Sequence, residues 1–296
     1  MSVVSGERTI FCEGKQSSLD FKLLSRVVEG ISGDQCTIIP AGSKFTFSIF
    51  AEGYFFPNEV TNQRYIVFRD RDFDVEPSSS IKLLKLSNKS GDRHINRHIT
   101  LTHRSSVENY LLDAKLIDTY WTTKYEEKID NPTSKWGHGK SPGIEAITQW
   151  IELSARNLQS YQAVRWALGD FARNVRKQFK TTWTKGSGTL PELLDLPSCQ
   201  SQALELINQY RQKVDSVTPE NFETKLNSYQ EIFIQSDFWT QEQYLIWFHG
   251  KDLQKEMQKQ QPKYISLSSF FDWAFTELNI ENYPDLKKLK ENIEQL

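Results

Sequence analysis

Three acidic side chains stand where the chain is expected to leave two buried strands. Glu13 directly follows the apolar run Arg8–Cys12, while Asp70 and Asp72 follow the apolar run Arg64–Phe68. Carboxylate oxygens are the ligands that Mg²⁺ and Mn²⁺ prefer in proteins. A divalent ion held in this way activates water and stabilises the leaving oxygen in phosphodiester hydrolysis. The acidic residues therefore predict metal-dependent hydrolysis if the two strands bring them to one point.

The neighbours of these carboxylates suit a site at the edge of a sheet. Gly14 has no side chain, so the backbone can turn sharply directly after Glu13. Arg69 and Arg71 flank Asp70, and we expect them either to hold phosphate or only to offset the acidic charge. Because an Asp-x-Asp pair after a strand is often a solvated turn, the hypothesis depends on its pairing with Glu13.

The first 115 residues alternate between strands and helices, as in α/β proteins. Apolar runs predict strands at 8–12, 36–40, 64–68, 81–86 and 97–103. Apolar residues at helical spacing predict helices at 19–31, at about 43–52, and from 105 or 106 onward. Strands joined by single helices form largely parallel sheets, and ligands bind outside the carboxyl ends of such strands.

After about residue 115 the pattern becomes almost entirely helical. We divide the chain into an α/β core at 1–115, a helical insertion at 116–240 and C-terminal helices at 241–296. The predicted helices lie at about 142–151, 157–179, 198–214, 219–232, 267–278 and 284–296. The basic run from Arg173 to Lys185 is the stretch to test for contact with nucleic acid, although a solvated helix face is its favoured explanation.

Composition limits the class of protein. The chain has 296 residues, of which 38% are hydrophobic and 25% charged, as in folded globular proteins. No apolar run approaches the roughly 20 residues that span a bilayer, and residues 1–8 lack the apolar stretch of a secretion signal. Cys12, Cys36 and Cys199 are scattered, so we expect reduced thiols, a cytoplasmic location and no membrane partner. The net charge of −2 neither requires nor excludes a nucleic-acid partner.

Four segments resemble the Toprim domain shared by topoisomerases, primases and the overcoming-lysogenization-defect (OLD) nucleases. The pair Glu13-Gly14 and the cluster at 70–72 are similar to its acidic motifs. Segment 103–112, HRSSVENYLL, resembles the Glu-Asn-Tyr-Leu segment of OLD-like nucleases, and segment 247–253, WFHGKDL, resembles their late Gly-Lys-Asp-Leu segment. The combination is most similar to stand-alone Toprim nuclease subunits that act beside an ABC-type ATPase in bacterial phage defence, such as those of PARIS-type systems.

The resemblance implies a Toprim-like, mostly parallel sheet flanked by helices, and a nuclease that cuts DNA or RNA, including transfer RNA, with Mg²⁺ or Mn²⁺. The metal ligands that it implies are Glu13, Asp70 and Asp72, supported by Asp74 and Glu108. Lys251 would be the catalytic cation that faces the scissile phosphate. Related sequences often place an Asp four residues after the Glu, whereas this chain has Ser17 there and its next acidic residue is Asp20.

The same resemblance implies partners. An ABC-type ATPase subunit would hold the nuclease inactive until infection, and released subunits could form homodimers.

Two other functions stay open. Residues 70–72 also resemble the nucleophile motif of haloacid-dehalogenase-like phosphatases, in which the first Asp is phosphorylated, but this interpretation leaves Glu13 without a role. The third hypothesis is a non-catalytic module that docks on a partner ATPase, because the long helical stretch suits docking.

Overall fold

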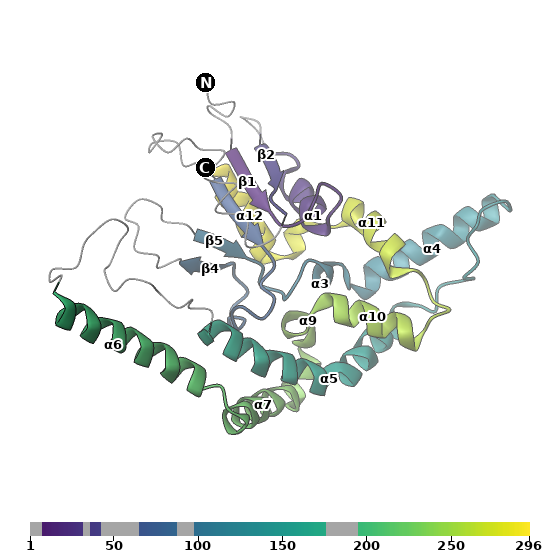
Figure 1. The fold of residues 1–296 in the computed structure, drawn as a ribbon. Helices are drawn as coiled ribbons and strands as arrows, with labels where there is room; N and C mark the ends of the chain where they lie inside the picture. Colours follow the sequence, from purple (N-terminus) through teal and green to yellow (C-terminus); the bar gives the residue numbers. More distant parts are fainter. Residues whose placement is uncertain (1–7, 32–35, 43–64, 88–97, 176–194) are drawn as a thin grey trace. The chain divides into compact units, whose positions relative to one another are not determined.

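A five-stranded sheet organises the N-terminal part of the chain. The computed structural model describes residues 8–31, 36–42, 65–87, 98–175 and 195–296. The strands are β1 (Arg8–Cys12), β2 (Cys36–Pro40), β3 (Tyr65–Arg69), β4 (Leu84–Ser87) and β5 (His98–Leu101). Their order is β2-β1-β3-β5-β4, in which β4 pairs antiparallel with β5 and the other neighbours run parallel (Figure 1). The chain is therefore α/β with a mostly parallel sheet, as the sequence predicts.

The register of the sheet brings the acidic segments to one edge. Phe11 of β1 lies opposite Val67 of β3, and Val67 lies opposite Ile99 of β5. The three strands therefore end nearly level with one another, and the segments that follow them emerge side by side. This carboxyl edge is where α/β proteins bind ligands.

Apolar side chains on both sides hold the sheet in place. One buried cluster consists of Phe11, Ile39, Ala41 and Val67. Helix α1 (Leu19–Val28) begins at Ser18, whose hydroxyl accepts a hydrogen bond from the N–H of Phe21, a typical N-cap arrangement. Its apolar stripe is buried, and the helix contacts β2, α11 (Leu267–Glu277) and α12 (Pro284–Glu294). The short loop between β1 and α1 is thereby fixed at both ends.

Two compact units make up the described residues. The first consists of 8–31, 36–42, 65–87, 98–158 and 237–296, and the second of 159–175 and 195–236. Besides the sheet and α1, the first unit contains α3 (Glu108–Leu111), α4 (Ala114–Asp130), the first half of α5 (Ile144–Val175), α9 (Tyr244–Trp247), α10 (Gly250–Gln260), α11 (Leu267–Glu277), a 3₁₀ turn (Ile280–Asn282) and α12 (Pro284–Glu294). Helix α8 (Ser236–Thr240) begins at the boundary. Residues 116–158, placed by the sequence pattern in the insertion, thus fold with the sheet.

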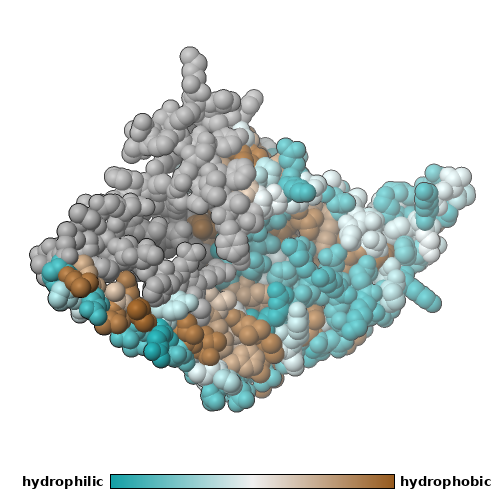
Figure 2. Space-filling model, in the orientation of Figure 1, coloured by the Kyte–Doolittle hydropathy of each residue, from teal (hydrophilic) through white to brown (hydrophobic). Residues whose placement is uncertain are grey.

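The second unit contains the rest of α5, α6 (Leu196–Asp215) and α7 (Pro219–Phe233). Trp166 of α5 and Tyr229 of α7 are buried against each other, with ring centroids 5.7 Å apart. The Tyr229 hydroxyl donates to Asp170, which also pairs with Lys225 over 3.2 Å. Exposed apolar residues lie along α6 (Figure 2).

One helix prediction was wrong, and two predicted segments cannot be compared. The two helices predicted at 142–151 and 157–179 form one continuous helix, α5, because no Pro or Gly interrupts 144–167. The predicted helix at 43–52 and most of the basic run to Lys185 lie outside the described residues. The three cysteines are free thiols, as predicted. None of the helices that the structure describes combines the length and apolar character needed to cross a membrane.

Candidate active site

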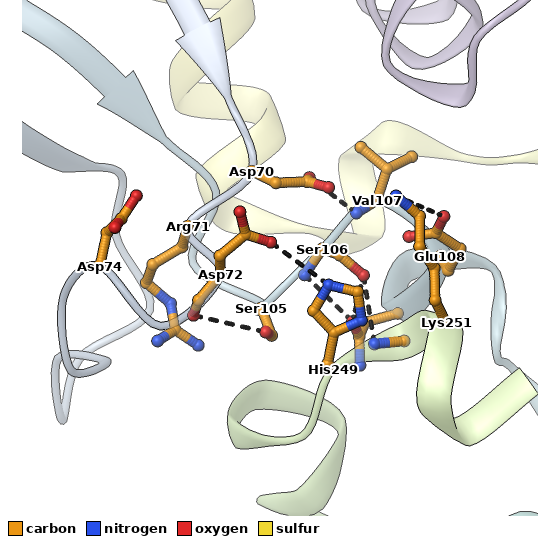
Figure 3. Close-up of polar contacts among 12 residues, drawn as sticks. Asp70, Arg71, Asp72, Asp74, Ser105, Ser106, Val107, Glu108, His249 and Lys251 are labelled. Carbon is orange, nitrogen blue, oxygen red and sulfur yellow. Dashed lines mark hydrogen bonds and ion pairs between the residues drawn. The ribbon is translucent and has the colours of Figure 1, made fainter. Parts of the chain in front are cut away.

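Asp70 stands directly after β3, the middle strand of the sheet, and is almost completely buried. Its Oδ1 accepts a hydrogen bond of 2.9 Å from the N–H of Val107, in the segment that follows β5 (Figure 3). Burial, together with the negative charges of Asp20, Glu108 and Asp72, raises the pKa of Asp70 well above its ordinary value. The carboxylate therefore belongs to a crowded acidic cluster and not to a solvated turn.

Asp72 has a left-handed backbone conformation, with a φ of +50°. This conformation is uncommon for residues with a side chain, although Asp adopts it more readily than most. The N–H of Asp72 donates to the carbonyl of Ser105 over 2.8 Å, and its Oδ1 lies 3.3 Å from Nε2 of His249. The His249 ring is stacked on Phe73. These contacts fix the turn after β3 and direct the Asp72 side chain toward His249 (Figure 3).

Glu13 follows β1 at the same edge of the sheet. The next residue, Gly14, has a φ of +83° and forms a two-way backbone bridge with Gly42. A Cβ atom on Gly14 would lie 2.6 Å from Cβ of Ser18, so only glycine fits the turn. The hydroxyl of Ser18 also donates to the Glu13 carbonyl over 3.2 Å. The start of α1 is thereby tied to the end of β1.

Asp20 joins the cluster from the first turn of α1, where sequence analysis left its role open. Its Oδ1 is buried and has no hydrogen-bond partner. Burial, and then the charges of Glu13 and Glu108, raise the pKa of Asp20 from 3.8 to about 7, against a smaller opposing effect of Lys251. Asp20 thus interacts with the Glu13 side of the site and with the Glu108 side, and connects them electrostatically.

Glu108 begins the short helix α3, and α10 docks directly on it. The Asn109 side chain donates to the Phe248 carbonyl over 3.0 Å, and the Gly250 N–H donates to the Ser106 hydroxyl over 3.2 Å. A Cβ atom on Gly250 would lie 2.7 Å from atoms of Ser106, Glu108 and Asn109, so the approach requires glycine. The two late motifs, distant in sequence, therefore lie against each other.

The docking of α10 on α3 also brings Lys251 to the site. Its Nζ lies 3.7 Å from Oε1 of Glu108, while half of its side chain stays exposed (Figure 3). Burial works against the charged ammonium, but the carboxylates of Glu108, Asp70 and Asp20 raise the pKa of Lys251 above its ordinary value. Glu108 Oε2 is buried and, like Asp20 Oδ1, has no hydrogen-bond partner. One cation thus faces several carboxylates.

Asp74, which the resemblance implies as a supporting metal ligand, is paired with Arg69 in the structure. Its Oδ2 lies 2.5 Å from Nη1 of Arg69, and both side chains are buried. In Figure 3 the Asp74 carboxylate points away from Asp70. The buried Arg69–Asp74 pair indicates a structural role for both residues.

Arg71 also points into the protein. Its buried guanidinium donates to the carbonyls of Val75, His103 and Ile246, at 2.7, 3.1 and 2.5 Å. The side chain therefore ties the turn after β3 to the end of β5 and to α9.

The donor set fits a hard divalent cation in its chemistry but is not preassembled. Within the described residues, no three His, Cys, Asp or Glu side chains are placed as a ready set of metal ligands. The cluster does offer buried carboxylate oxygens without hydrogen-bond partners, on Asp20 and Glu108, and two carboxyl groups with raised pKa values. Such groups gain most from a cation, because they repel one another without one.

Comparison with protein-family models and with curated proteins gives no match to this chain.

Two members of the site had no role assigned from the sequence: Asp20 was named but left open, and His249 was not recognised. Asp20 could have been found from its position, because the second residue of a helix capped by Ser18 lies beside the end of β1. His249 is part of the segment 247–253, yet nothing in the sequence indicated its contact with Asp72.

Proposed function

We propose that this chain is a metal-dependent nuclease of the Toprim type, similar to the OLD-like nucleases. The observation that carries the proposal is the group of mutually repelling carboxylates, Asp20, Asp70 and Glu108, gathered around Lys251 at the carboxyl edge of a parallel sheet. Glu13 and Asp72 extend this group from β1 and from the turn after β3. Isolated surface acids do not accumulate such repulsion, which destabilises the fold unless a ligand offsets it.

The residues divide the chemistry among themselves. Glu13, Asp70 and Asp72 would hold Mg²⁺ or Mn²⁺, with Asp20 and Glu108 as further acidic partners. The bound ion would activate water and stabilise the leaving oxygen. Lys251, with its exposed half beside Glu108, binds the scissile phosphate and neutralises charge that develops on it. His249 keeps the Asp72 carboxylate in place.

The resemblance also supports a biological setting for this proposal. The substrate is DNA or RNA, including transfer RNA, and the reaction serves as the toxic step of bacterial phage defence in the cytoplasm. An ABC-type ATPase subunit restrains the chain, which forms homodimers when it is released.

Incubation of the purified chain with duplex DNA, single strands and transfer RNA tests the activity. We expect cleavage that requires Mg²⁺ or Mn²⁺, stops in EDTA and is lost in Asp70→Ala/Asp72→Ala. Asp130→Ala, which removes an exposed carboxylate at the end of α4, is the matched control and should cut normally. Undiminished cutting by the double variant would refute the proposal.

The same purified proteins separate the two alternatives. Loss of activity in both Glu13→Gln and Asp72→Asn favours the nuclease, whereas a harmless Glu13 change together with phosphate release favours a haloacid-dehalogenase-like phosphatase. Isothermal titration with Mn²⁺ addresses the docking module, because a chain that binds no divalent ion retains only that role.

A further inference from the structure

Helix α10 carries a row of lysines that begins inside the candidate site. Lys251, Lys255 and Lys259 recur every four residues on the helix, and Lys263 follows after its end. All four are exposed, and the Lys259 side chain keeps 80% of its surface in solvent. Because a helix rises 1.5 Å per residue, successive lysines stand about 6 Å apart along one side of it.

The opposite side of α10 is buried, which leaves the lysine side facing solvent. Gly250, Leu253 and Met257 are buried. Glu256 on the same helix is largely kept away from the solvent-facing side. Its side chain is only 12% exposed and accepts a hydrogen bond from the Asn157 amide over 3.1 Å. Its ion pair with Lys259 spans 3.5 Å and still leaves 80% of the Lys259 side chain in solvent. The surface over α10 is predominantly hydrophilic in Figure 2.

Aromatic side chains stand at the far end of the row. A ring nitrogen of His138 lies 3.2 Å from the Lys263 carbonyl, which brings the loop after α4 to the end of the row. The ring of Trp136 meets that of His138 edge to face, with centroids 4.7 Å apart. Lys135 and Lys140 of the same loop are exposed. Cations that follow a backbone, combined with aromatic rings for bases, are the common features of single-strand binding.

We propose that the α10 lysine row and the Trp136–His138 pair form a track for single-stranded nucleic acid that leads to the carboxylate site. A single file of cations matches one phosphodiester backbone, and the exposed His138 ring, with the half-buried Trp136 ring beside it, can stack only on unpaired bases. Lys251 is the point at which the track meets the acidic cluster. The inference rests on the proposed nuclease function for its biological sense, but binding along the track does not require cleavage.

Fluorescence anisotropy with a labelled single-stranded oligonucleotide, in EDTA and over a range of salt concentrations, tests the track. Lys255→Gln/Lys259→Gln should lower the slope of log affinity against log salt by about 1.4, from roughly 0.7 per phosphate contact. That slope corresponds to about 25-fold weaker binding near 0.1 M salt. The matched control, Lys287→Gln/Lys288→Gln, removes the same charge from exposed positions on α12 and should bind like the wild type.

The aromatic end has its own measurement. Trp136→Leu should weaken oligonucleotide binding about tenfold and leave binding of inorganic polyphosphate unchanged. Because Trp136 also touches Tyr120, the exposed His138→Ala provides a second variant that leaves this contact intact, and it should show the same selectivity.

Several results would overturn the track: equal effects of the two lysine double variants, no binding by the wild type, or binding of duplex as tight as that of single strands. Failure of the proposed function looks different. If the chain binds oligonucleotide along α10 but never cuts with Mg²⁺, the track is supported and the nuclease function is refuted. If the chain cuts normally while Lys255→Gln/Lys259→Gln binds like the wild type, the nuclease function is supported and the track is refuted.

Discussion

The charge of Asp20 should destabilise the metal-free fold, and its removal by Asp20→Asn should stabilise it in a pH-dependent way. In the folded chain Asp20 keeps its proton up to about pH 7, whereas the unfolded chain releases it near pH 3.8. Between these values the unfolded state binds fewer protons, so the free energy of unfolding of the wild type falls as the pH rises. The variant has no titrating group at this position, so its free energy of unfolding does not fall with pH for this reason.

The expected size follows from the pKa of Asp20. One pKa unit corresponds to about 1.4 kcal/mol. For a folded-state pKa of about 7, the stability gap between variant and wild type should widen by an amount on the order of 2–3 kcal/mol between roughly pH 5 and pH 8. Since Asp20 lies in the first turn of α1, its negative charge also interacts favourably with the helix dipole. That interaction offsets about 0.3–1 kcal/mol of the gain.

Urea denaturation in EDTA at several pH values, followed by circular dichroism, measures the gap. Asp130→Asn, at an exposed position on α4, is the control and should track the wild type at every pH. Added Mn²⁺ should stabilise the wild type more than Asp20→Asn, because the ion relieves the same repulsion. A gap that stays constant from pH 5 to pH 8 would refute the electrostatic reasoning about this cluster.

Three further predictions concern how the site is assembled. Gly250→Ala should destabilise the fold by about 1–3 kcal/mol in urea denaturation, because its methyl group has no room against α3, while Gly137→Ala, which meets nothing within 4 Å, should cost less than 1 kcal/mol; equal costs would contradict the docking. His249→Ala should weaken Mn²⁺ binding 10- to 100-fold in isothermal titration, and His249→Gln, which keeps an N–H for Asp72, should restore most of it; unchanged affinity in both would exclude a positioning role. Arg71→Met should lose three hydrogen bonds and about 3–5 kcal/mol of stability; a midpoint like that of the wild type would show that these bonds contribute little.

The position of the acidic edge could be predicted from the sequence because it depends on local rules. Strands joined by helices run parallel, and residues that directly follow parallel strands meet at one edge. Glu13 and Asp70 could be placed in this way.

Contacts that depend on tertiary structure could not be predicted in the same way. Whether Asp74 faces the cluster depends on the buried Arg69 that pairs with it, and the sequence shows only that the two are near. The contact of His249 with Asp72 depends on the packing of α10 against α3. In the sequence, only the resemblance of segment 247–253 to known nucleases indicated that this segment belongs to the site. Hydrophobic periodicity and secondary-structure propensity describe one helix or strand at a time. They therefore do not predict contacts between elements that are far apart in the sequence.

The return of α10 to α3 has a consequence for synthesis. The carboxylates of β1 and β3 are made early, but His249 and Lys251 belong to the last fifth of the chain. A nascent polypeptide that has not yet reached α10 has the acidic sheet edge without its lysine. The proposed nuclease site is therefore incomplete until α10 has been translated, which protects the cell from unfinished chains.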